Sequence, residues 1–254
     1  MQNKSFPIKA VFFDLGYTLI YFSGNFNKII SESYLVLANE LVAAGCKIDP
    51  QDFARQFDAK MKGYYRQRQI DFLERPVEKI IKEILRELDQ DHFPDEVYMK
   101  AMHAMYLTTE RNWLIEQDAH ETLQRLIDRH FCLALISNAS NAWDVNNLIN
   151  NYSLRPYFST ILISASEGIR KPDPRIFQRA AQNLNIDLAE AVMVGDTLDA
   201  DVLGAHRSGI KAIWISRRID KPVDLAAVTP EMRPDAEIHS LEELPELITD
   251  WNNA

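Results

Sequence analysis

The chain has 254 residues, of which 46% are hydrophobic, and this is enough to bury one large α/β core and a smaller appended unit. The formal net charge of -9 argues against a nucleic-acid partner, because binding to a phosphate backbone requires a concentrated basic surface. The two cysteines, Cys46 and Cys132, imply neither a disulfide framework nor a zinc cluster, and both are expected to be buried small apolar residues.

The amino-terminal segment predicts a cytoplasmic protein. Residues 1–9 are too short and too polar for a signal peptide, and no apolar run in the chain approaches membrane-spanning length. We therefore expect no membrane partner. No conspicuous interaction segment is present, so a monomer or a weak homodimer is the expected state.

The first predicted strand ends on an acid. Residues 10–13 are apolar, and Asp14 follows them directly, ahead of Gly16 and Thr18. This pattern is typical of a buried strand that brings a carboxylate to the carboxyl edge of a sheet, where open α/β folds place their ligands. Asp14 is therefore a candidate nucleophile, although acids also end strands for purely conformational reasons.

A helical pattern then replaces the strand pattern for about ninety residues. Apolar side chains recur there at three- and four-residue steps, in four stretches that begin near Asn27, Pro50, Pro76 and Pro94. No strand is predicted between these helices. They are expected to form an inserted all-helical domain over residues 23–116.

Strands and helices alternate in the rest of the chain. The predicted strands are 132–136, 160–163, 191–194 and 211–215, and the predicted helices are 119–129, 142–150, 174–184 and 200–208. This alternation predicts a parallel sheet with right-handed crossovers. Residues 1–22 and 117–254 are therefore expected to form one α/β core domain.

Polar residues with complementary chemistry follow these strands. Ser137 and Asn138 end the strand 132–136, Asp196 follows the strand 191–194, and Asp201 lies in the loop beyond it, whereas Lys171 precedes a Pro-Asp-Pro segment. A parallel sheet would bring these groups to the same edge as the first acid. A nucleophile, a phosphate-binding hydroxyl, a neutralising cation and metal-holding acids are the parts of a phosphoryl-transfer site.

The order and spacing of these segments resemble the four motifs of the haloacid dehalogenase-like (HAD) hydrolase superfamily. The segments that carry the resemblance are 14–18, 137–138, 171–174 and 195–201. The resemblance extends over nearly the whole chain. It implies a Rossmann-like core with a helical cap inserted between the first and second motifs, and a Mg2+-dependent phosphatase that acts on a small phosphorylated metabolite.

The resemblance also implies roles for single residues. Asp14 would attack phosphorus to form an aspartyl-phosphate, and Asp14, Asp196 and the carbonyl of Gly16 would hold Mg2+, which prefers oxygen ligands and several waters. Asp201, or with less support Asp199, would add a ligand through water or hold the lysine in place. Asp199 also suits the N-cap of the helix that follows it.

The remaining residues of the resembling motifs would bind phosphate. Ser137 and the amide of Asn138 would donate to the transferring phosphoryl oxygens, with Gly16 beside them, and Lys171 would neutralise their charge. Thr18 would brace the turn after the nucleophile.

One position departs from the pattern of most phosphatases in the superfamily. They carry a second Asp two residues after the nucleophile, which protonates the leaving group, whereas this chain has Gly16. Such a proton-transfer group contributes about 10²- to 10⁴-fold in rate. Tyr17, Asp199 or a cap residue are the substitutes that the sequence leaves open.

Two other functions follow from this departure. A 2-haloacid dehalogenase needs no leaving-group acid, but the dehalogenases of the superfamily use no metal, so Asp196 and Asp201 would have no purpose there. A binding or regulatory protein with weakened catalysis is the other alternative. The retained Asp14, Lys171 and Asp196 argue against it.

Overall fold

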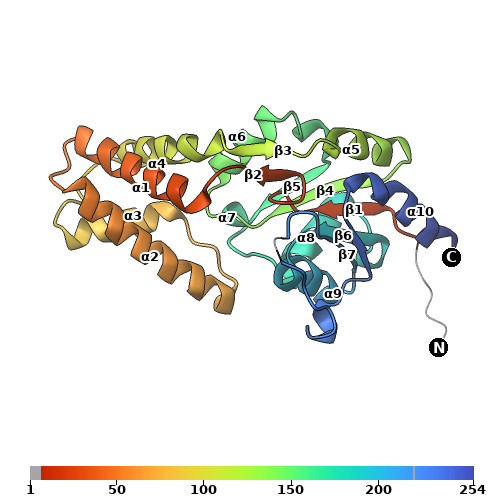
Figure 1. Cartoon of the computed structure of the whole chain (residues 1–254). Coiled ribbons are helices and arrows are strands. Elements are labelled where there is room, and N and C mark those ends of the chain that lie inside the picture. Colours follow the sequence, from red (N-terminus) through yellow and green to blue (C-terminus); the bar gives the residue numbers. More distant parts are fainter. Residues whose placement is uncertain (1–6, 220) are drawn as a thin grey trace.

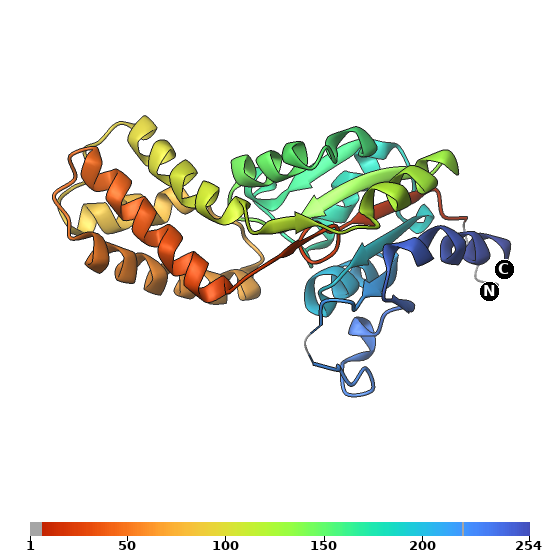
Figure 2. The same ribbon diagram turned by 45° about the horizontal axis from the view of Figure 1, so that its top comes forward.

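A computed structural model describes residues 7–219 and 221–254 of the chain. Helices gather at one end of the molecule and a sheet covered by further helices lies at the other, as Figure 1 shows. Figure 2 gives the same arrangement from a second direction. The predicted class, an α/β core with a parallel sheet, is confirmed.

The sheet has six parallel strands in the order β5-β4-β1-β6-β7-β8. Their bounds are β1 (Ala10–Phe13), β4 (Cys132–Ser137), β5 (Thr160–Ile163), β6 (Ala191–Gly195), β7 (Lys211–Ile215) and β8 (Ala236–Ile238). Ala10 of β1 lies opposite both Cys132 and Ala191. Because β1 lies inside the sheet between β4 and β6, the residue that follows it reaches the middle of the carboxyl edge.

Alternate residues of these strands point to opposite faces of the sheet and pack into two apolar layers. Val11 and Phe13 face the layer covered by α5 (Ala119–Asp128), α6 (Ala142–Asn151) and α10 (Leu244–Asn253). Phe12 faces the other layer, covered by α8 (Pro174–Leu184) and α9 (Leu203–Arg207). With both faces buried, the strands read as nearly continuous apolar runs, which is why four strands after residue 116 were predictable. The three-residue β8 was not predicted.

The helix predicted over 200–208 begins earlier and in a different form. Its first turn is π-helical (Leu198–Val202), and α9 continues from it. The N-cap is Thr197, so the expectation that Asp199 caps this helix is wrong. The amides of Asp201 and Val202 both donate to the Thr197 carbonyl, at 2.8 and 3.4 Å.

Four long helices form the inserted region, as predicted. They are α1 (Phe26–Ala43), α2 (Pro50–Asp71), α3 (Val77–Glu87) and α4 (Asp95–Glu110), and a short helix α7 (Ser164–Glu167) lies in the core nearby. The Asp49 side chain caps α2 by accepting from the amide of Asp52 at 2.7 Å. The four helices enclose an apolar cluster of their own, built around residues such as Leu37, Phe57 and Ile81.

A short antiparallel ribbon joins the helical region to the sheet. It pairs β2 (Ile20–Phe22) with β3 (Trp113–Ile115), so that Tyr21 lies opposite Leu114. Strands of three residues carry too little periodicity to be predicted. We propose that this ribbon marks the division between the core (1–22 and 117–254) and the cap (23–116).

Two smaller expectations concern burial and membranes. Cys46 is buried as expected, but Cys132 is exposed, so that expectation is wrong for the second cysteine. Cys132 is the first residue of β4, at the open amino end of the sheet. Among the described residues, no helix is both long enough and apolar enough to cross a membrane.

Candidate active site

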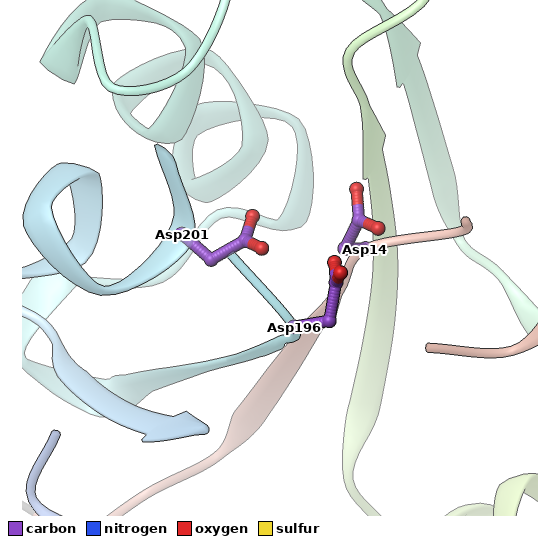
Figure 3. Close-up of side chains that lie close together, drawn as sticks. All are labelled: Asp14, Asp196 and Asp201. Atoms are coloured by element: carbon purple, nitrogen blue, oxygen red, sulfur yellow. The ribbon is translucent and has the colours of Figure 1, made fainter. Parts of the chain in front are cut away.

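Three carboxylates meet at the carboxyl edge of the sheet. Asp14 follows β1, Asp196 follows β6, and Asp201 comes from the π-helical turn, and Figure 3 shows their side chains directed into a common space. One oxygen from each lies within 4.8 Å of the others. The structure therefore brings together the three acids that the sequence placed far apart.

Short-range contacts hold each carboxylate in position. The amide of Asp14 donates to the Val194 carbonyl at 2.9 Å, which extends the pairing of β1 with β6. The hydroxyl of Thr197 donates to Asp196 Oδ1 at 3.0 Å, and its amide donates to Asp201 Oδ2 at 3.0 Å. A Cβ atom on Gly195 would stand 2.2 Å from Asp201 Oδ2, so glycine is required for this close approach.

Lys171 lies between two of the acids. Its Nζ atom is 2.5 Å from Asp14 Oδ1 and 2.6 Å from Asp201 Oδ1, and its side chain is 1% exposed. The side chain of Asn138 holds the lysine from behind: Oδ1 accepts from the Lys171 amide and Nδ2 donates to the Lys171 carbonyl, both at 2.9 Å. The sequence assigned Asn138 a phosphate-binding amide but not this clamp.

The charges at this edge do not balance. Burial raises the pKa of Asp14 to about 6, where Lys171 opposes the rise and Asp201 adds to it. Burial, together with Asp14 and Asp201, raises the pKa of Asp196 to about 8. Burial also disfavours the charge of Lys171, but the two acids outweigh it and raise its pKa. When all three carboxylates are ionised, they face the single ammonium of Lys171, which leaves two negative charges of the cluster without a partner.

This excess is the charge of one divalent cation. An all-oxygen set of carboxylates, with room left for water, is the donor set that Mg2+ prefers. Asp14, Asp196 and Asp201 therefore fit a hard divalent cation, and Gly16 lines the same cavity. Asp199 is exposed and lies outside the cluster.

A cavity of about 360 Å3 opens above the acids. Ser137, buried at the end of β4, lines it together with Gly16 and Lys171. Thr18 does not line it. That side chain is fully buried, and its hydroxyl has no hydrogen-bond partner in the described part of the chain, so it supports the turn by packing alone.

Aromatic side chains close one wall of the cavity. Tyr17 and Trp113 meet edge to face with ring centroids 5.7 Å apart. Tyr17 has φ 57°, a left-handed conformation that suits glycine better than tyrosine. Trp113 belongs to β3, so this wall comes from the ribbon that the sequence did not predict.

The residues that line the cavity and that sequence reasoning missed include Gln69, Trp113, Asp144 and Arg170. Arg170 stands directly before the lysine of the third motif, and this adjacency was the signal available. Asp144 lies in the first turn of α6, and burial, with Glu110 nearby, raises its pKa to about 8. For Gln69 and Trp113 the sequence holds no comparable signal.

Comparison with a family model decides the relationship. The model of haloacid dehalogenase-like hydrolases matches residues 8–209. The chain belongs to this family. All four motif segments of this HAD protein lie within the matched range.

Two solved structures share the fold over nearly the whole chain. A 2-haloacid dehalogenase from Pseudomonas syringae pv. Tomato DC3000 has a TM-score of 0.68 and 25% sequence identity, and the match covers 96% of this chain and 99% of that one. A HAD phosphatase from Thermococcus onnurineus has a TM-score of 0.63 and 23% identity, covering 95% and 98%. The second likeness concerns the fold alone.

Curated relatives include phosphatases. A phosphoserine phosphatase of Thermus thermophilus is 34% identical over 134 residues, which is 53% of this chain and 51% of that protein. The chain thus matches about half the length of that relative. A glyceraldehyde 3-phosphate phosphatase of Methanopyrus kandleri is 29% identical over 246 residues, covering 95% of this chain and 97% of that protein.

Proposed function

We propose that this HAD protein is a Mg2+-dependent phosphatase that hydrolyses phosphate monoesters of small metabolites through an aspartyl-phosphate on Asp14. The supporting observation is the charge imbalance at the sheet edge, where Asp14, Asp196 and Asp201 surround Lys171 alone. Mutual repulsion disfavours such a cluster unless a cation occupies the site, and that cation would in turn attract a phosphoryl group.

Asp14 is positioned as the nucleophile. An oxygen of its carboxylate would form a bond to phosphorus while the bond from phosphorus to the ester oxygen breaks. The contact with Lys171 Nζ at 2.5 Å favours the ionised, nucleophilic carboxylate. A water molecule would then attack phosphorus, which releases inorganic phosphate and regenerates Asp14.

The other residues bind and orient the phosphoryl group. The hydroxyl of Ser137 and the ammonium of Lys171 line the cavity on the side of β4. We propose Asp14, Asp196 and the Gly16 carbonyl as the groups that hold Mg2+, with Asp201 fixing Lys171. The bound cation would supply positive charge against which the phosphoryl oxygens are stabilised.

The leaving oxygen needs a proton that Gly16 does not provide. Among the side chains that line the cavity and have no other assigned role, Tyr17, Asp144 and Asp199 can carry or exchange a proton. None of them occupies the position two residues after the nucleophile. We therefore propose that esters with good leaving groups, such as aryl phosphates, are hydrolysed faster than alkyl phosphates.

Release of phosphate tests this function. A panel of phosphorylated metabolites and one aryl phosphate is measured with Mg2+ and with a chelator, for the parent and for Asp14→Asn. We expect metal-dependent turnover that falls by about 10⁴-fold in the variant. Turnover that persists in Asp14→Asn, or that ignores the metal, would contradict the proposal.

Dehalogenation is the second candidate. The solved dehalogenase from Pseudomonas syringae shares 25% identity and the highest of the quoted TM-scores, and carbon–halogen displacement requires no leaving-group acid. The cluster of three carboxylates weighs against it, because that reaction gives Asp196 no role. Chloride release from 2-haloacids in the presence of chelator would favour dehalogenation.

A further inference from the structure

One buried guanidinium at the cavity wall has hydrogen-bonding capacity to spare. Arg170 is 5% exposed and lines the cavity together with Asp14 and Lys171. Its Nε and Nη1 atoms have no hydrogen-bond partner within residues 7–219 and 221–254. Buried guanidinium donors are normally satisfied, and leaving them unpaired is costly. An anion bound in the cavity would compensate the charge of this guanidinium.

The neighbouring carboxylate does not meet this need. Arg170 Nη1 is 3.6 Å from Glu74 Oε2, which is too long for a hydrogen bond. The oxygens of Glu74 already accept from Arg68 Nη1 at 3.1 Å, from Ser164 Oγ at 2.8 Å and from the hydroxyl of Tyr64. Two guanidinium groups therefore share this one fully buried carboxylate, and the cluster keeps a net positive charge.

The backbone holds Arg170 at the junction of cap and core. Its amide donates to the Phe72 carbonyl at 3.2 Å, and its carbonyl accepts from Asp173 at 2.9 Å. Leu73 and Ile169 form an antiparallel bridge beside it. Burial and the charge of Arg68 lower the pKa of Arg170 against the opposing effect of Glu74, which again indicates a cation with too little compensation.

The position of Arg170 in the chain places it beside the reaction. It directly precedes Lys171, so the two cations extend from Cα atoms about 3.8 Å apart, and both line the same cavity. Lys171 contacts the nucleophile. A substrate whose phosphoryl group lies at Asp14 would therefore have its remaining groups within this small cavity, next to the second cation.

We propose that Arg170 binds a second anionic group of the substrate, a carboxylate or a further phosphate, and so selects small phosphate monoesters that carry an additional negative charge. This inference rests on the proposed phosphatase function. Guanidinium groups bind such oxyanions through charge-assisted hydrogen bonds, and Arg170 brings its charge to the cavity wall without a hydrogen bond to Glu74.

Matched pairs of esters test the assignment. Phosphoglycolate is compared with phosphoglycolamide, and 1,3-propanediol bisphosphate with 3-hydroxypropyl phosphate. The protein variants are Arg170→Met, Arg170→Lys and, as a control, Arg179→Met, whose exposed guanidinium pairs with Glu167 outside the cavity. We expect Arg170→Met to lower kcat/KM for the more anionic member of at least one pair by about 10- to 100-fold relative to its partner.

The two pairs distinguish the sources of the anion. A selective loss in the first pair identifies a carboxylate, and a selective loss in the second identifies a phosphate. Arg170→Lys should recover part of the preference because it keeps the charge but not the paired donors, and Arg179→Met should leave it unchanged. An equal loss for both members of both pairs would overturn the proposal, since it would show that Arg170 acts only through the fold.

Ligand binding without turnover separates this inference from the function. In an Asp14→Asn background, the rise in Tm caused by each ester is measured with and without Arg170→Met. A larger rise with the anionic esters that depends on Arg170 supports the subsite even if no ester is hydrolysed. If Arg170→Met does not fold, equal rises with acid and amide, and with bisphosphate and monophosphate, in the Asp14→Asn protein would overturn it.

Discussion

The two walls of the cavity are built in different ways. The core wall consists of residues that directly follow strands, such as Asp14, Ser137 and Asp196, so sheet topology fixes their positions. The wall at the cap junction contains Arg170, which contacts the linker between α2 and α3 through Phe72 and Glu74. We propose that the rigid edge carries the chemistry and the junction the choice of substrate, which a different cap sequence could alter without disturbing the nucleophile.

The sharpest way to test the core wall is to remove its cation. Lys171→Met should lower kcat by about 10³-fold or more, because the phosphoryl charge and Asp14 both lose their ammonium partner. The exposed Lys62→Met serves as the matched control. Phosphate release under saturating substrate gives the comparison. Activity within tenfold of the parent would show that Lys171 is not part of the chemistry.

Restoring the missing acid should act in the opposite direction. A side chain fits at Gly16, where a Cβ atom would meet the Trp113 ring at an ordinary 3.6 Å. Gly16→Asp should raise turnover of alkyl phosphates by about 10- to 100-fold and change aryl phosphates little.

The matched control for that substitution is Gly16→Asn, which adds similar bulk without a carboxyl group that can donate a proton. Steady-state rates on one alkyl and one aryl ester decide the outcome. Equal effects of Gly16→Asp and Gly16→Asn on both esters would mean that proton transfer does not limit the rate.

A substitution in the wall at the cap junction should change the stability of the protein more than its catalytic rate. Glu74→Gln removes the carboxylate shared by Arg68 and Arg170, and loss of a buried partner costs about 3 kcal/mol in the free energy of unfolding. The exposed Glu87→Gln is the control. Urea unfolding measures both variants. A change below about 0.5 kcal/mol for Glu74→Gln would contradict a buried charge cluster at this junction.

The last effect concerns Asp144 and depends on pH. Its pKa is about 8 in the folded protein against 3.8 in the unfolded chain, so the native state holds a proton that the unfolded state has released between these values. Stability therefore falls as pH rises from about 4 to about 8. Asp144→Asn removes this dependence, so between pH 5 and pH 8 the parent should lose about 3 to 4 kcal/mol of stability relative to the variant.

The free energy of unfolding is measured for the parent and for Asp144→Asn at pH 5 and at pH 8. The titration of the sheet-edge acids is common to both proteins, so it cancels when the two are compared. Asp250→Asn, an exposed substitution, provides the baseline. A difference between parent and Asp144→Asn that does not change with pH would show that Asp144 ionises normally.

The same contrast explains what the sequence could predict. Buried parallel strands are apolar runs, and the polar residue that follows such a run marks the sheet edge, so Asp14, Ser137 and Asp196 could be predicted from the sequence. The cap helices were predictable from apolar residues that recur every three or four positions, and the start of α2 from the N-cap at Asp49. These features depend on local pattern and on rules of topology.

What the sequence did not predict depends on contacts between distant segments. Trp113 reaches the cavity because β3 pairs with β2 across the whole inserted region, and neither strand is long enough to show a period. Asn138 clamps Lys171 through two hydrogen bonds over 33 positions. In the sequence nothing distinguishes Glu74 and Arg170 from ordinary surface charges, because they meet only where the linker between α2 and α3 packs against the core. No local pattern encodes such contacts.

Isotope labelling tests the central claim most directly. The protein turns over a phosphate ester in water enriched in ¹⁸O, and mass spectrometry then examines both the released phosphate and the peptide that contains Asp14. Attack of water on phosphorus should place one ¹⁸O in each phosphate and leave the Asp14 carboxylate unlabelled. Label in the Asp14 peptide would instead mean that water attacks the carboxyl carbon of an ester intermediate, as carbon–halogen displacement requires, and would contradict the proposed reaction.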